Sequence, residues 1–454
     1  MKDENKNGTE NLQMEDLLDQ ELRNAGRLSV EDVTKELEQT EKGLPRQSIQ
    51  NCVTVLQKDP ILAGSIRQNV LTDKIEIVKD VGWKRRGEAI TDTDVNQIRL
   101  YLENHYGLTR EKQIRAALDI VSSENSFHPI RDYLNTLEWD GVERIRHLLP
   151  KYLGAEESDY VYEMTKLMML GAISRAFRPG CKFEIMLCLV GGQGAGKSTL
   201  LRFLAIRDEW FTDDLRRLDD DNVYRKMQGH WFIEMAEMLA TTSAKSIELI
   251  KSFLSRTKET YKIPYEVHPE DRPRQCVFLG TFNNVNFLPY DKTGNRRFSP
   301  VQIDASRAEH HPLENEQECR QYIIDCWAEA MFIYRSGNFK LTFPKEMEKT
   351  VRAMQAEYMP DDSTFGVIQH FLDTFSGNEV CAIQIYEEAF GQTYDSRNRS
   401  VLQPISNTMN AGMPGWSTKT KSHRFANYGT QRAWIRLTEE EGFMQVPDNA
   451  DIPF

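Results

Sequence analysis

One glycine-rich segment constrains the fold more than any other part of the chain: Gly191-Gly192-Gln193-Gly194-Ala195-Gly196-Lys197-Ser198. An apolar run, Phe183 to Val190, leads into it, and a helical pattern beginning at Thr199 follows it. A glycine-rich turn between a buried strand and a helix lets backbone N–H groups converge on phosphate oxygens, helped by the helix dipole. A chance turn is the alternative, but the strand-then-helix context favours a P-loop. The predicted nucleotide-binding residues are Gly191, Gly192, Gln193, Gly194, Ala195, Gly196, Lys197, Ser198 and Thr199.

Two further apolar runs predict buried strands of the same sheet. The first, His230 to Ile233, leads into Glu234 and Glu237, and the second, Cys276 to Phe282, leads into Asn283. Continuous apolar runs separated by helical patterns are typical of parallel strands, whose carboxyl ends gather the chemistry of an open α/β sheet. The predicted fold class is therefore α/β, with a P-loop core.

Nucleotide hydrolysis requires a magnesium ligand, an oriented water and positive charge at the terminal phosphate. Lys197 would contact the β and γ phosphates, Ser198 and Glu234 would hold Mg²⁺, and Glu237 could polarise the water, although the two glutamates could exchange roles. Asn283 is the candidate sensor, with a turn-forming asparagine as the alternative. Arg296 or Arg297 could act as an arginine finger in a neighbouring subunit, which requires a ring; structural ion pairing is the alternative reading.

Basic and aromatic residues alternate in the segment 251–265, which suits a loop that follows single-stranded nucleic acid. Lys258, Tyr261 and Lys262 are its candidate contacts, and a solvated charged face explains the lysines equally well. Near the C-terminus, residues 396–436 carry seven basic and no acidic side chains. The candidate DNA contacts there are Arg397, Arg399, Lys419, Lys421 and Arg424, with protein docking as the alternative.

Composition gives the outline of the domains. The net charge of −12 is uneven, because residues 1–45 carry 12 acidic and 6 basic side chains and read as an acidic mobile tail. Residues 46–178 predict a helical N-terminal region, residues 179–345 the P-loop core, and residues 346–454 a helical linker and a winged-helix-like unit of three helices and a hairpin. No apolar stretch approaches the ~20 residues of a membrane span, which predicts a cytoplasmic protein. The seven cysteines predict reduced core residues.

Ordered motifs along the chain resemble the virulence-associated protein E family, found in phages and mobile elements and similar to superfamily 3 helicases. Beside the P-loop, they are Phe127-His128-Pro129-Ile130-Arg131-Asp132-Tyr133-Leu134, Leu137-Glu138-Trp139-Asp140-Gly141, Pro179-Gly180-Cys181-Lys182, Phe253-Leu254-Ser255-Arg256, Gly280-Thr281-Phe282-Asn283, Gly294-Asn295-Arg296-Arg297-Phe298 and Tyr428-Gly429-Thr430-Gln431-Arg432.

The resemblance implies an AAA+-type ATPase core, a hexameric ring and a role in replicating phage or mobile-element DNA in a bacterial cell. It places Lys258 and Lys262 in a loop facing a central pore, and Glu234 as the Walker B acid. The spacing Glu-x-x-Glu departs from the adjacent acids of related helicases, which leaves the role of Glu237 open, and no primase activity is implied.

The sequence therefore predicts an ATP-driven, Mg²⁺-dependent DNA motor. Its predicted partners are single-stranded DNA in the pore, duplex DNA at the C-terminal unit, copies of the same chain and host replication proteins. The rival hypothesis is a nucleotide-dependent switch or replication adaptor that binds DNA without unwinding it. A small-molecule P-loop kinase is disfavoured, because no acceptor pocket is recognisable.

Overall fold

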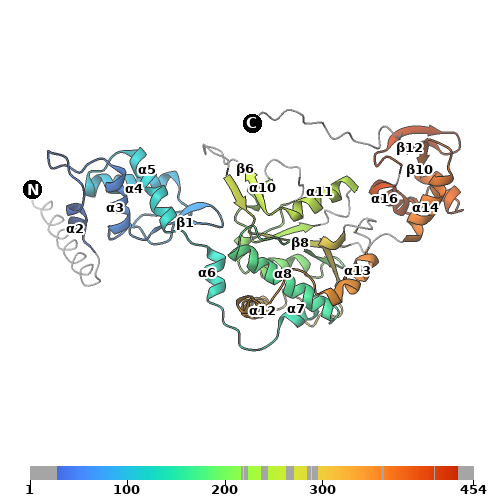
Figure 1. The fold of residues 1–454 in the computed structure, drawn as a ribbon, viewed down its shortest axis with the longest axis horizontal. Helices are drawn as coiled ribbons and strands as arrows, with labels where there is room; N and C mark the ends of the chain where they lie inside the picture. The colour runs from blue at the N-terminus through green and yellow to red at the C-terminus, as the bar shows by residue number, and fades with distance from the viewer. Residues whose placement is uncertain are drawn as a thin grey trace, which may run out of the picture. The chain divides into compact units, whose positions relative to one another are not determined.

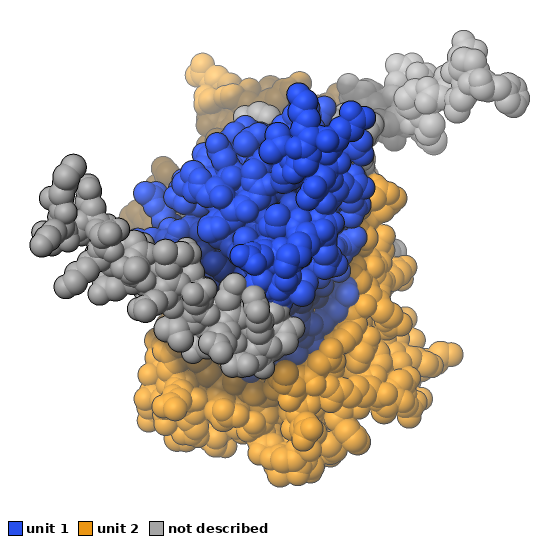
Figure 2. All heavy atoms as spheres, turned by 90° about the vertical axis from the view of Figure 1, so that its left-hand side faces the viewer, with its two compact units in different colours: residues 1–133 blue, residues 134–454 orange. Residues whose placement is uncertain are grey.

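The computed structural model divides the chain into two compact units, residues 1–133 and residues 134–454 (Figures 1 and 2). It describes residues 28–215, 218, 223–236, 244–261, 270–283, 288, 295–358, 362–413 and 415–437. Among these residues, no helix combines the length and apolar character that crossing a bilayer requires. All seven cysteines are free, and all but the half-buried Cys181 are buried.

The first unit is mainly helical, with one antiparallel hairpin, and surrounds its own apolar core. Its helices pack through apolar residues at helical spacing, such as Ile98 and Leu102 on one and Ile114 and Leu118 on another, all four of which are buried. Its elements are α2 (Val30–Lys35), α3 (Ile49–Lys58), β1 (Ile66–Asn69), β2 (Lys74–Ile77), α4 (Asp92–Tyr106) and α5 (Glu111–Glu124), and α6 (Pro129–Asn135) spans the end of the unit.

Residues 28–45, which the sequence assigned to a mobile tail, differ from that prediction. Ser29 caps α2 and forms a capping box with Asp32, so a short helix begins here. Val33 and Leu37, four residues apart, are buried in the core of the first unit. The acidic composition of the segment obscured this apolar pair in the sequence. Because the pair packs into the core, the segment is part of the first unit from residue 29 onward. Residues 1–27 lie outside the described residues.

The second unit contains a five-stranded sheet in the order β4-β5-β8-β3-β9, with every neighbouring pair parallel. The predicted α/β class with a parallel sheet is therefore confirmed. The central strands are buried along their whole length, which explains their continuous apolar sequences. The strands are β3 (Met186–Val190), β4 (Phe211–Thr212), β5 (Phe232–Ala236), β8 (Val277–Phe282) and β9 (Phe298–Gln302), and a separate antiparallel hairpin is formed by β6 (Lys258–Tyr261) and β7 (Glu270–Pro273).

Helices cover both faces of this sheet (Figure 1). Met186, Cys188 and Val190 of β3 face a core that includes Phe253 and Leu254 of α11. On the other face, Trp231 donates from its indole Nε1 to the Ala172 carbonyl of α8 at 3.0 Å. The helices are α7 (Ile145–Leu153), α8 (Asp159–Phe177), α9 (Lys197–Leu204), α10 (Val223–Met227), α11 (Ala244–Ser255), α12 (Glu316–Ser336) and α13 (Glu348–Glu357).

The sequence placed residues 134–178 with the N-terminal helical region, whereas they belong to the second unit. Helix α8 is buried on nearly all sides, and its Tyr160 hydroxyl donates to the Pro300 carbonyl of β9 at 2.9 Å. Gly171 of the same helix leaves room for the Phe183 ring, because a Cβ there would lie 2.4 Å from that ring. Residues 134–178 thus form part of one face of the sheet, and the chain divides near residue 133 instead of 178.

The last described segment has its own apolar core. It contains the predicted helices and hairpin, and adds the short strand β10, which makes a three-stranded antiparallel sheet in the order β10-β12-β11. Its elements are α14 (Asp362–Thr374), β10 (Glu379–Cys381), α15 (Ala382–Gln384), which continues as a π-helical turn over Ile385–Ala389, α16 (Gln403–Gly412), β11 (Lys421–Phe425) and β12 (Gly429–Ile435).

Candidate nucleotide and metal site

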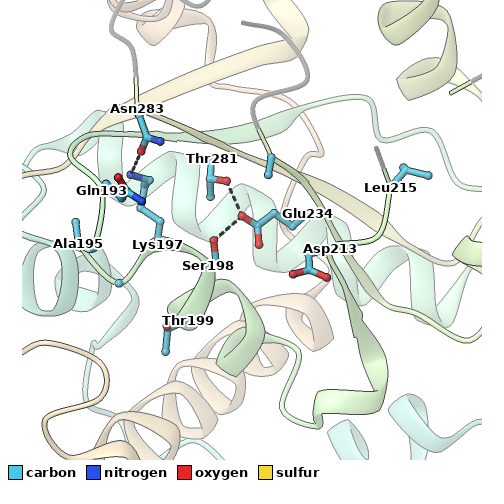
Figure 3. A pocket seen from close by; sticks show the side chains of 13 residues that line it. Gln193, Ala195, Lys197, Ser198, Thr199, Asp213, Leu215, Glu234, Thr281 and Asn283 are labelled. Carbon is cyan, nitrogen blue, oxygen red and sulfur yellow. Dashed lines mark hydrogen bonds between the residues drawn. The ribbon is translucent and has the colours of Figure 1, made fainter. Parts of the chain in front are cut away.

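A cavity of about 540 Å³ opens at the carboxyl ends of the parallel strands (Figure 3). The loop after β3 forms one wall, and residues at the ends of β4, β5 and β8 form the rest. The sheet order places β8 between β3 and β5, so its end faces both the loop and Glu234. The cavity is lined by Gln193, Gly194, Ala195, Gly196, Lys197, Ser198, Thr199, Asp213, Leu215, Glu234, Ala236, Thr281 and Asn283.

Glycine is required at three positions of the loop for two physical reasons. Gly194 and Gly196 have φ angles of +79° and +82°, in the left-handed region that residues with a Cβ disfavour. A Cβ on Gly196 would also lie 2.8 Å from Pro312 Cδ, and one on Gly191 would lie 2.5 Å from Ile303 Cγ1. The sequence therefore fixes a narrow turn, which ends where α9 begins at Lys197.

The first turn of α9 is suited to an anion. Gly196 occupies the N-cap position and has no side chain, so no side-chain hydrogen bond caps this helix. The first backbone N–H groups of a helix have no partner within the helix, and they carry the positive end of its dipole. Ser198 and Thr199 lie in this first turn and line the cavity. A phosphate group in the cavity would be a favourable acceptor for these N–H groups.

Lys197 is 8% exposed and its ammonium group contacts the loop itself. Its Nζ donates to the carbonyl oxygens of Gly191 and Gly192 at 2.5 and 2.8 Å, and to Asn283 Oδ1 at 3.0 Å. Figure 3 shows Lys197, at the start of α9, and Asn283, directly after β8, pointing toward each other. The structure thus brings together two predicted site residues that lie far apart in the sequence, with the positive charge held at the cavity wall.

Glu234 forms a second polar centre on β5. Its Oε1 accepts hydrogen bonds from Ser198 Oγ at 2.7 Å and from Thr281 Oγ1 at 2.5 Å (Figure 3). The residue is 1% exposed, and its Oε2 is buried without a hydrogen-bond partner among the described residues. A buried carboxylate oxygen with no donor is costly unless something else coordinates it. A cation held between Glu234 and Ser198 would satisfy this oxygen.

Two polar residues of the cavity, Thr281 and Asp213, were not among the predicted site residues. Thr281 lies in β8 and Asn283 directly follows this strand, so the spacing of two residues between them was the available signal. Asp213 follows β4, a strand of two residues that is too short for a periodic pattern. Figure 3 shows the Asp213 carboxylate beside Glu234.

Of the remaining predicted catalytic residues, Arg296 and Arg297 do not line this cavity. Glu237 lies outside the described residues. Arg296 and Arg297 form a short 3₁₀ turn, Asn295–Arg297, immediately before β9. Met186, at the start of β3, pairs with Phe298, whereas the glycine-rich loop follows Val190 at the other end of β3. The two arginines therefore lie at the amino ends of the strands, away from the cavity of their own chain.

The predicted nucleic-acid contacts fall on the hairpin and on the C-terminal segment. Lys258 is the first residue of β6 and Tyr261 the last. The Lys258 side chain is 58% exposed and pairs with Asp271 across the hairpin. Lys262 lies outside the described residues. In the C-terminal segment all five predicted contacts are exposed: Arg397, Arg399, Lys419, Lys421 and Arg424.

Arg397 and Arg399 are not part of the third helix of this segment. Both residues precede α16, which begins at Gln403. Arg397 also pairs with Asp395 at 2.8 Å, so an acid just outside the basic stretch meets part of its charge. Lys421 and Arg424 lie on β11, three residues apart, and therefore point to opposite faces of that strand.

Fold and site define a mixed α/β protein with a parallel five-stranded sheet and a glycine-rich loop at its carboxyl edge. A sequence model of the virulence-associated protein E-like domain matches residues 134–360. The chain belongs to this family, which confirms the family expected from its motifs. The matched range coincides with the part of the second unit that holds the sheet and the cavity.

Solved structures with some likeness include three of the C-terminal region of NrS-1. An apo structure of its residues 305–718 is 14% identical, with 82% of this chain and 95% of that chain covered and a TM-score of 0.39. Two A-form apo structures of the same region are 12% identical, cover 82% of this chain and 96% of theirs, and have TM-scores of 0.38 and 0.39. Likeness at this level assigns no activity to the chain. No curated protein matches it in sequence.

Proposed function

We propose that this protein hydrolyses ATP with Mg²⁺ and couples hydrolysis to movement along DNA, as a ring-forming helicase or helicase-like motor of phage or mobile-element replication. One observation carries the nucleotide part of the proposal. The buried, half-satisfied carboxylate of Glu234 is hydrogen-bonded to Ser198, at the start of a helix whose N-terminus faces the same cavity. A cation beside a helix N-terminus that binds phosphate is the arrangement that a magnesium nucleotide requires.

The residues present fit Mg²⁺. Among the described residues there is no group of three or more His, Cys, Asp or Glu side chains placed to hold a metal. Mg²⁺ in nucleotide sites uses one or two carboxylates, waters and substrate phosphates, so a larger protein cage is not needed. Ser198 Oγ and the free Oε2 of Glu234 would hold the ion, which supplies charge neutralisation between the β and γ phosphates.

The side chains of this chain would then act by position and charge. Lys197 would exchange its carbonyl partners for the terminal phosphates, because a charged acceptor competes favourably with neutral carbonyls. Asn283, already bonded to Lys197, would lie close enough to orient a water at the γ-phosphate. Thr281 would keep the Glu234 carboxylate facing Ser198. Glu237 remains our candidate for polarising the water.

The DNA part of the proposal rests on exposed charge. Lys258 projects from a hairpin that stands apart from the main sheet, and the five basic residues of the C-terminal segment are exposed. A hairpin carrying basic residues can follow the phosphates of a single strand. The three-helix and hairpin order of the C-terminal segment, with its basic residues before α16 and on β11, supports contact with duplex DNA.

The nucleotide assignment is tested by ATP hydrolysis with and without single-stranded DNA. Lys197→Ala should abolish turnover and Glu234→Gln should reduce it strongly, while both variants keep the thermal unfolding midpoint of the wild type within a few degrees. Lys340→Ala, which removes an exposed lysine outside the cavity, is the matched control. Turnover in Lys197→Ala equal to that of the wild type would refute the assignment.

Movement along DNA requires a separate assay, because a nucleotide-dependent switch or replication adaptor would also hydrolyse ATP. Strand displacement on forked DNA, with ATP and with a non-hydrolysable analogue, separates the two functions. A motor displaces the strand only with ATP. Nucleotide-dependent binding to the fork without displacement would favour the switch.

A further inference from the structure

Asp213 brings a second carboxylate to the cavity that Glu234 lines. It directly follows β4, the edge strand that pairs in parallel with β5. Thr212 pairs with Ile233 in this ladder, and the next residues in the same register are Asp213 and Glu234. Neighbouring strands lie about 4.8 Å apart, and residues in register point to the same face of the sheet. Figure 3 accordingly shows the Asp213 carboxylate beside that of Glu234.

Both carboxylates have oxygens that the described part of the chain does not use. Glu234 is 1% exposed, and its Oε2 is buried without a hydrogen-bond partner among the described residues. Asp213 is exposed and makes no hydrogen bond or ion pair with any residue that the structure describes. Two like charges side by side destabilise each other, and a bound cation reverses this effect. The buried, unpartnered oxygen of Glu234 indicates a ligand here, because a solvated acidic surface would leave no such oxygen.

The charges of the cavity are separated along the sheet. In the order β4-β5-β8-β3-β9, Asp213 and Glu234 lie at the ends of the neighbouring strands β4 and β5. Lys197 lies after β3 and bonds to Asn283 at the end of β8. An anionic ligand in this cavity would meet a positive side chain on one side and two carboxylates on the other. The side with the carboxylates is unfavourable for an anion unless a cation lies between them.

We propose that Asp213 joins Glu234 and Ser198 in holding the divalent cation, as the second carboxylate of the site. This inference rests on the Mg²⁺-nucleotide site proposed above and adds a residue to it. Mg²⁺ bound with phosphates uses one or two carboxylates, and the number of ligand charges tunes the affinity of a protein for such cations. Asp213 therefore determines how tightly the cation is held, while Glu234 and Ser198 determine where it lies.

The first test measures binding of Mn²⁺, which replaces Mg²⁺ as a probe because its EPR signal in free solution is lost on binding. The protein is titrated with Mn²⁺ in the presence of a non-hydrolysable ATP analogue, so the readout does not depend on turnover. Asp213→Asn should weaken Mn²⁺ binding by about 10–100-fold, the loss typical of groups that support a metal site. Asp213→Glu keeps the charge and should recover most of the affinity.

Asp214→Asn is the matched control. Asp214 is the adjacent carboxylate in the sequence and is also exposed, but it pairs with Lys226 at 3.4 Å and does not line the cavity. The variant therefore changes the net charge of the chain by the same amount as Asp213→Asn. Its Mn²⁺ affinity should stay within about twofold of the wild type, because screened charges outside the site contribute little.

The second test uses the sign of a stability change, which separates a cation ligand from a residue that supports the fold. Without metal, Asp213→Asn removes a like charge beside Glu234, so its thermal unfolding midpoint should equal or exceed that of the wild type. With Mg²⁺ and the ATP analogue, the midpoint should rise less in Asp213→Asn than in the wild type, because a cation that binds only the folded state stabilises it by mass action. A lower metal-free midpoint with an unchanged gain from Mg²⁺ would overturn the proposal.

Four outcomes of the Mn²⁺ titration decide the matter. Wild-type affinity in Asp213→Asn, in a protein that hydrolyses ATP, overturns the role of Asp213 and leaves the proposed function intact. Weakened binding in Asp213→Asn, in a protein that hydrolyses no ATP even with DNA present, supports the cation site and refutes the proposed function. Equal losses in Asp213→Asn and Asp214→Asn overturn the proposal, since net charge would then account for the affinity. An unmodified protein that binds no Mn²⁺ overturns the cation site itself.

Discussion

The three glycines at positions 192, 194 and 196 provide a graded test of the loop conformation. Alanine at Gly192 meets open space and no positive φ, so it should change the free energy of unfolding by no more than about 0.5 kcal/mol. Alanine at Gly194 must adopt a φ of +79°, a conformation that costs about 1–2 kcal/mol, offset by the ~0.4–1 kcal/mol that alanine gains through the unfolded chain. A net loss of about 1 kcal/mol follows.

Alanine at Gly196 should be the most damaging of the three. It shares the left-handed backbone, with a φ of +82°, and its Cβ would lie 2.8 Å from Pro312 Cδ and 3.1 Å from His311 Nε2. Overpacking of a rigid contact adds about 1–3 kcal/mol. The expected total is about 2–4 kcal/mol, and the helix N-terminus that follows would shift with the loop.

Urea unfolding of the three variants measures the stability series, and titration with a fluorescent ATP analogue measures binding. Affinity should fall in the same order, with Gly192→Ala nearest to the wild type and Gly196→Ala weakest. Equal stability of Gly192→Ala and Gly196→Ala would refute the reasoning, because the left-handed turn and its contact with Pro312 would then have no energetic consequence.

Three further predictions address the proposed Mg²⁺ site, a buried carboxyl group and the hairpin. Thr281→Val removes a hydrogen-bond donor to Glu234 and should weaken Mg²⁺ activation of ATP hydrolysis by about 10–100-fold. Thr281→Ser keeps the hydroxyl and should not weaken it. Equal Mg²⁺ titrations of the two variants would contradict the role of the hydroxyl. Burial raises the pKa of the Glu329 carboxyl above its ordinary 4.5, although two backbone N–H groups that donate to it lower the pKa. The protonated carboxyl therefore stabilises the folded state at low pH, and this contribution is lost as pH rises through the pKa of the folded state. Unfolding of Glu329→Gln as a function of pH should lack this decline above pH 4.5, and an unchanged profile would show that another group titrates. Lys258→Glu should reduce the stimulation of ATP hydrolysis by single-stranded DNA but change the free energy of unfolding by less than about 1 kcal/mol. Lys340→Glu is the control. Full stimulation in Lys258→Glu would show that the hairpin does not contact DNA.

The features that the sequence predicted well are those determined by local pattern. The loop, the strand before it and the helix after it are contiguous, so residue types and spacing define them together. The apolar runs at β5 and β8 were recognisable because strands buried on both faces carry mostly apolar residues. Family membership followed from many such local motifs in a fixed order.

The features that the sequence did not predict depend on partners distant in the chain. Helical periodicity identified α8 but not its place on the sheet, since a helix buried on nearly every side has no polar stripe to show which face is outward. Val33 and Leu37 were hidden in an acidic segment for a related reason: two apolar residues suffice to anchor a short helix, but they are too few to change its composition.

The two arginines before β9 also depend on partners that are distant in the chain. The sequence alone therefore could not distinguish one from the other. Motif and spacing name Arg296 and Arg297 as neighbours of identical chemistry. A hydrogen bond to Ser255, at the end of α11, distinguishes Arg297, whereas Glu184, before β3, pairs with both arginines. The contact with Ser255 holds Arg297 at the amino ends of the strands, the edge of the sheet opposite the cavity, and this placement depends on residues that lie far apart in the sequence.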